Sequence, residues 1–80
     1  MSLMDAIKES RLKYQKRYYN HYKKYIENKE DKENHGAMLE ASYVLINFFG
    51  LTSKEVEEIE YNGGLTNDEV DELYTSSEEV

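Results

Sequence analysis

Apolar residues recur at three- and four-residue steps between Met4 and Ile26, which is the spacing of one face of an α-helix. The pattern predicts a helix over residues 4–28, about 37 Å long at 1.5 Å per residue. Two polar residues, Arg11 and Gln15, interrupt its broad apolar face, so we expect polar pairing there, with Glu9 or Glu27 of a partner chain. We expect an interface on this face, formed by Ile7, Arg11, Tyr14, Tyr18, Tyr22 and Tyr25.

Residues 27–36 contain no apolar side chain. We interpret them as a frayed helix end and a connection, with Asn34 as the N-cap of the next helix. The alternative is a solvated continuation that joins the two helices into one rod. Gly36 and the missing apolar anchor argue against the rod.

Residues 37–49 are apolar nearly all round, with only Glu40, Asn47 and Tyr43 forming a polar strip. A helix of this kind sits at the centre of a fold. Gly50 then supplies the position that ends it.

Two segments, 50–59 and 64–73, repeat one pattern at an offset of 14 residues. In each, a threonine is followed three residues later by a glutamate, and leucine and valine flank them. This is a capping box with a hydrophobic staple, so each segment begins a helix. The predicted capping residues are Thr52 with Glu55 and Thr66 with Glu69.

The two helices predicted from this repeat, about 53–61 and 67–75, are too short to be stable alone. They must therefore dock on the central helix, and Val56 with Ile59 and Val70 with Leu73 are the expected docking pairs. The chain as a whole is predicted to be a single all-α domain over residues 1–80, a small bundle of about four helices. Residues 75–80 are expected to form a disordered tail. Residues 1–3 precede a second methionine and fit a vector-derived extension.

The apolar core is small, because Leu, Ile, Val and Phe together make up 17 of 80 residues. Eight tyrosines supply much of the remaining apolar surface, and tyrosine is favoured at interfaces. Oligomerisation is a common remedy for so small a core. We therefore expect a homodimer through the first helix, or a protein partner docked there.

The formal net charge of −7 is unevenly distributed. Residues 1–32 carry a balance of +4, whereas residues 33–80 carry −11. There is no cysteine, no apolar run of membrane-spanning length and no signal-peptide layout. These features predict a cytoplasmic protein with no membrane partner.

Candidate chemistry is sparse. The two histidines, His21 and His35, lie on different elements and match no metal-binding motif, so we expect no metal site. The acids of 55–72 do not follow the ligand spacing of a calcium loop. Because no nucleophile, base and oxyanion donors come together, we expect no enzyme activity, no catalytic residues, no cofactor and no small-molecule substrate.

The leading interpretation is a non-enzymatic protein–protein interaction module. One alternative is a nucleic-acid-associated protein that uses the basic side of the first helix, where lysines and arginines alternate with tyrosines. The acidic half disfavours this, because it would repel phosphate. Another alternative is an acidic decoy that mimics phosphate charge. The bias towards Lys, Glu, Asn and Tyr resembles that of small bacteriophage and mobile-element proteins of AT-rich bacteria.

Overall fold

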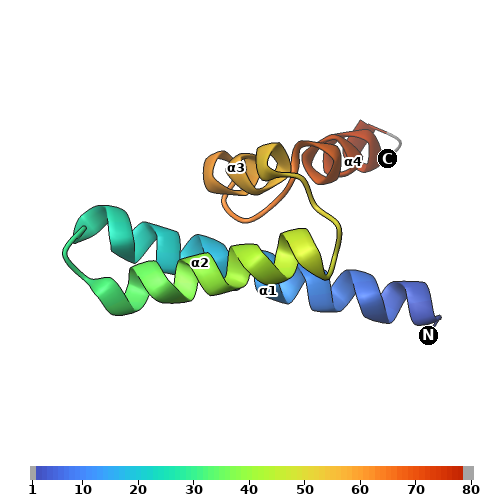
Figure 1. The fold of residues 1–80 in the computed structure, drawn as a ribbon. Coiled ribbons are helices and arrows are strands. Elements are labelled where there is room, and N and C mark those ends of the chain that lie inside the picture. The colour runs from blue at the N-terminus through green and yellow to red at the C-terminus, as the bar shows by residue number, and fades with distance from the viewer. Residues whose placement is uncertain (1, 79–80) are drawn as a thin grey trace.

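Four helices and no strand make up the part of the chain that the computed structural model describes, which is the backbone of residues 2–78 and the side chains of residues 2–74. They are α1 (Leu3–Glu27), α2 (Lys32–Asn47), α3 (Ser53–Tyr61) and α4 (Asn67–Glu78). The predicted small all-α bundle is confirmed. Figure 1 shows α2 running back along α1, with α3 and α4 together on one side of this hairpin.

A short turn, residues 28–31, separates α1 from α2 and excludes a single continuous rod. Asp31, not Asn34, is the N-cap of α2, and its side chain accepts a hydrogen bond from the Asn34 backbone N–H at 3.2 Å. The prediction placed the cap three residues too late, because the first turn of α2 is polar and offers no apolar position to mark it. The Asn34 amide donates to Asp31 and its oxygen contacts the His21 ring, which fixes the turn.

The helix α1 is longer than its partner, since it has 25 residues and α2 has 16. In Figure 1 the N-terminal turns of α1 extend past the end of α2. We call this end of the hairpin, where α2 stops and α1 continues, the open end. The helix α2 ends at Asn47 with Phe48 as its C-cap, two residues earlier than predicted, and Gly50, at φ 77°, then turns the chain away from α1.

The helix α3 closes the core. The predicted capping box is present at its start, where Thr52 and Glu55 exchange hydrogen bonds. Its docking residues Val56 and Ile59 are buried, as predicted, in a core that also includes Tyr18, Ala41, Leu45 and Leu51. The helix ends at Tyr61, and Gly63 just beyond its C-cap has a φ of 68°, which lets the Gly64 N–H reach the Ile59 carbonyl at 2.9 Å.

The helix α4 docks differently from the prediction. Leu73 is 59% exposed and Val70 is half-buried, so these two do not form the expected apolar contact with α2. The helix contacts α3 and reaches α1 through polar side chains, because Glu69 faces α1 from the first turn. It also continues to Glu78 rather than ending near 75, since Thr-Ser-Ser-Glu contains no helix breaker. The predicted disordered tail is thus wrong for 75–78, and residues 79–80 lie outside the described residues.

One side of α2 is less buried than we expect for a helix that is apolar on nearly every side. Ala41 and Leu45 enter the core, but Leu39 and the C-cap Phe48 are exposed, in addition to Tyr43 on the predicted polar strip. Only α1 and α3 contact α2 within the described residues, and two helices do not cover every face of a third. Across residues 2–78, no helix combines the length and the apolar character needed to span a membrane.

Candidate protein-interaction surface

The tyrosine-rich face of α1 packs largely inside the chain. Tyr18 is 4% exposed, and its hydroxyl donates to Glu60 of α3 at 2.5 Å. Its burial, together with the hydrogen bond to Glu60 and the charge of that carboxylate, raises the pKa of the Tyr18 phenol well above its usual range. Within this chain Tyr18 covers the core, so little of its ring is left exposed for the interface that the sequence predicts there.

The neighbouring predicted interface tyrosines are also engaged. Tyr22 stacks on Tyr18 with ring centroids 6.5 Å apart, and Tyr25 stacks on His35 of α2 at 4.6 Å. Both are half-buried. The face predicted for a partner chain thus covers α2 and α3 over most of its length.

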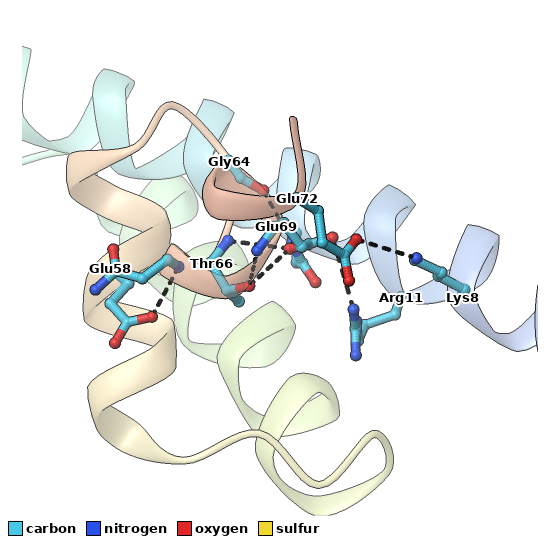
Figure 2. A network of polar contacts seen from close by, with 9 residues as sticks. Lys8, Arg11, Glu58, Gly64, Thr66, Glu69 and Glu72 are labelled. Atoms are coloured by element: carbon cyan, nitrogen blue, oxygen red, sulfur yellow. Dashed lines mark hydrogen bonds and ion pairs between the residues drawn. The ribbon is translucent and has the colours of Figure 1, made fainter. Parts of the chain in front are cut away.

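The polar pairing predicted within this face is present, but it is intramolecular. Gln15 is fully buried, and its amide donates to the Gly64 carbonyl at 3.0 Å and to Glu69 Oε1 at 2.7 Å. Arg11 pairs with Glu69 at 3.6 Å. Neither Glu9 nor Glu27 is involved. Figure 2 shows the side chains of Lys8 and Arg11 on α1 directed towards the acids of α4.

The second predicted capping box lies within this cluster. Glu69 Oε1 accepts from both the backbone N–H and the hydroxyl of Thr66 at 3.0 Å, and the Glu69 N–H donates back to Thr66 at 3.3 Å. Burial alone would raise the pKa of the Glu69 carboxyl. The hydrogen bonds from Thr66 and Gln15 and the charge of Arg11 outweigh burial and lower this pKa below its ordinary value.

An apolar groove lies at the open end of the hairpin, between α1 and the last turns of α2. Tyr14 is the one predicted tyrosine that lines it. Its ring packs at 6.0 Å from that of Phe49, which meets Phe48 edge-on at 5.0 Å. The groove is lined by Ser10, Tyr14, Tyr43, Val44, Asn47, Phe48 and Phe49.

The rim of this groove is exposed and apolar. Phe48 is 79% exposed and Tyr43 is 67% exposed. Ile7, which lies one turn before Ser10 and two turns before Tyr14 on α1, is 46% exposed. Ile7, Ser10 and Tyr14 share one stripe of the helix, because they are spaced by three and four residues. We call the groove together with Ile7 the open-end surface. Of the predicted interface residues, it contains Ile7 and Tyr14.

Sequence reasoning missed the α2 part of this surface. The signal was present, because a helix apolar on every side needs more covering helices than a chain of 80 residues can provide. Interpreting that helix as central hid the exposed position Phe48, although Tyr43 was already placed on its polar strip.

The basic side of α1 is exposed as well. The cations on it are Lys13, Lys16, Arg17, Lys23 and Lys24, and no acid interrupts residues 10–26. Two of them lie over tyrosine rings, Arg17 over Tyr14 at 5.5 Å and Lys23 over Tyr19 at 5.6 Å. The tyrosines on this side thus serve as surfaces for the basic side chains.

No cluster of three or more His, Cys, Asp or Glu side chains suited to a metal ion occurs within the described residues. His21 contacts Asn34, and His35 stacks on Tyr25, so both rings belong to the α1–α2 packing. Comparison of the chain with protein-family models, with curated proteins and with solved structures found no match.

Proposed function

We propose that this protein is a non-enzymatic interaction module that docks on a helix of another protein molecule through its open-end surface. The observation that carries the proposal is the exposure of Phe48 beside Tyr43 at the mouth of an apolar groove. Contiguous exposed apolar surface of this kind marks interaction sites. In a chain with so small a core, leaving two large aromatic rings in water needs a reason outside the monomer.

The composition of the groove suits packing. Its polar side chains other than Tyr14 and Tyr43 are Ser10 and Asn47, which are uncharged. A general acid or base requires a titratable group within hydrogen-bond reach of the reacting atom. An apolar helix face needs only complementary shape and a few polar contacts.

The available area is adequate. A fully buried aromatic side chain contributes about 150–250 Å², so the exposed fractions of Phe48 (79%) and Tyr43 (67%) supply about 220–370 Å² between them. A specific interface needs about 600 Å² from each partner. The remainder would come from Ile7, Tyr14, Val44 and the backbone around Gly50.

Site-specific photo-crosslinking tests this proposal. A photoreactive phenylalanine analogue at position 48 should give one discrete crosslinked product in cells that produce the protein. The matched control is the same analogue at position 61, because Tyr61 is 78% exposed but lies on α3. The product should disappear when Ile7→Asp is added to the position-48 variant.

The composition of the product, determined by mass spectrometry, identifies the partner. Equal crosslinking from positions 48 and 61, or a position-48 product that persists with Ile7→Asp, would contradict docking at the open-end surface.

A further inference from the structure

We infer that the partner at the open-end surface is a second copy of this chain, packed with its α1 antiparallel to the first and crossing near Ser10. This inference rests on the proposed function and adds the identity of the occupant and the register. It follows from the shape of the open end, from the residue at the crossing and from the order of charges along α1.

The open end presents a projection and a groove side by side. The N-terminal turns of α1 extend beyond α2 (Figure 1), and the groove lies next to them, between α1 and the last turns of α2. A two-fold axis beside this end places the projecting α1 of one copy over the groove of the other, and the reverse. Such an isologous contact is self-complementary, and it closes after two copies.

The residue at the centre of the stripe permits this approach. Ser10 is small and lies between Ile7 and Tyr14 on the same face of α1. Helix axes pack 8–10 Å apart depending on the side chains at the contact, and a small residue allows the closer end of that range. With the crossing near Ser10, Ile7 of each copy packs against Tyr14 of the other.

The order of charges selects the antiparallel arrangement. Along the exposed flank of α1 the acid Glu9 comes first and the cations Lys13 and Arg17 follow. Antiparallel pairing about Ser10 brings Glu9 of one copy beside Lys13 of the other, twice in the dimer. In a parallel pair the two-fold axis would place Glu9 of one copy and Lys13 of the other on opposite flanks, so this contact would not form. Neither Glu9 nor Lys13 takes part in the ion pairs formed among the side chains of residues 2–74.

A charge-reversal mixing experiment tests the register. The Glu9→Lys variant and the Lys13→Glu variant should each dimerise about tenfold more weakly than the wild type, because each turns both attractive contacts across the interface into like-charge contacts. An equimolar mixture of the two should form a heterodimer at least as tight as the wild type, since both cross-contacts then become attractive. Sedimentation velocity at low salt, repeated at 1 M salt where screening removes the difference, measures this.

The mixture separates this contact from an ordinary pairing within one helix. Glu9 and Lys13 are four residues apart, so they can also pair within α1. An intrahelical pair lost in each variant would not be restored by mixing them. Lys24→Glu is the matched control, because it reverses an exposed cation of α1 outside the contact and should leave dimerisation unchanged.

Three results would overturn the inference. If mixing fails to restore the dimer while Phe48→Asp still abolishes it, the register is wrong and the proposed docking surface stands. If the wild type is a monomer but position 48 crosslinks to a different protein, the inferred partner, a second copy of this chain, is wrong and the proposed docking surface stands. If the wild type is a monomer and position 48 gives no product, both the inference and the proposed function fail.

Discussion

The two capping boxes have the same residue types but different surroundings. Thr52 is exposed and its box joins only the ends of one helical turn. Thr66 and Glu69 are buried, and Glu69 also receives the Gln15 amide and lies beside Arg11. The second box therefore both begins α4 and attaches it to α1.

We therefore predict that Thr66→Ala is the more destabilising cap substitution. It should lower the free energy of unfolding by about 2 kcal/mol, because it leaves buried hydrogen-bonding groups without a partner. Thr52→Ala should cost about 0.5–1 kcal/mol, since water can replace an exposed cap. Urea denaturation of both variants checks the order, and a larger loss for Thr52→Ala would contradict it.

The lowered pKa of Glu69 predicts a pH dependence. A carboxyl whose pKa is lower in the folded state stabilises the fold above its unfolded pKa, about 4.3, and this stabilisation is lost as the pH falls through the folded pKa. Glu69→Gln should thus be clearly less stable than wild type at pH 7, and the gap should narrow below about pH 4. The control is Glu57→Gln on an exposed position of α3. A gap that stays constant down to pH 3 would show that the charge of Glu69 is not stabilising.

At the scale of the elements, hydrophobic periodicity predicts the helices well. All four occur, and the bounds of α1 and α3 are within a residue of those predicted. Periodicity fails where a helix begins with a polar turn, as at Asp31, or continues in polar residues, as in α4 after residue 75. In both places apolar spacing carries no information. The capping residue sets where α2 begins, and the lack of a helix breaker lets α4 continue.

The packing of the elements was harder to predict than their existence. Arg11 and Gln15 within an apolar face correctly indicated polar pairing. Their shared partner Glu69 lies 58 residues from Arg11 and 54 from Gln15 along the chain, and local spacing does not reveal such contacts. The candidate site shifted for the same reason, because α3 covers the face around Tyr18 and the open end is left uncovered.

For the whole molecule, some large apolar side chains form a core, and others are exposed at the open end and elsewhere on the surface. The core joins α1, α2 and α3, while α4 is attached mainly by polar contacts (Figure 2). The molecule measures 45 × 26 × 20 Å, and α1 extends along its hairpin beyond the end of α2. This elongated form follows from the unequal lengths of α1 and α2, and it exposes the surface that we propose for docking.

Sedimentation equilibrium at micromolar concentration tests the central claim, docking of a second copy at the open-end surface, most directly. The wild type and Tyr61→Asp should both have a mass above the 9.5 kDa of one chain, approaching twice that value. Phe48→Asp should sediment as a folded monomer, with its helical circular dichroism retained, because Phe48 lies outside the core. A wild type that remains a monomer, or a Phe48→Asp variant that associates as strongly as Tyr61→Asp, would contradict the account.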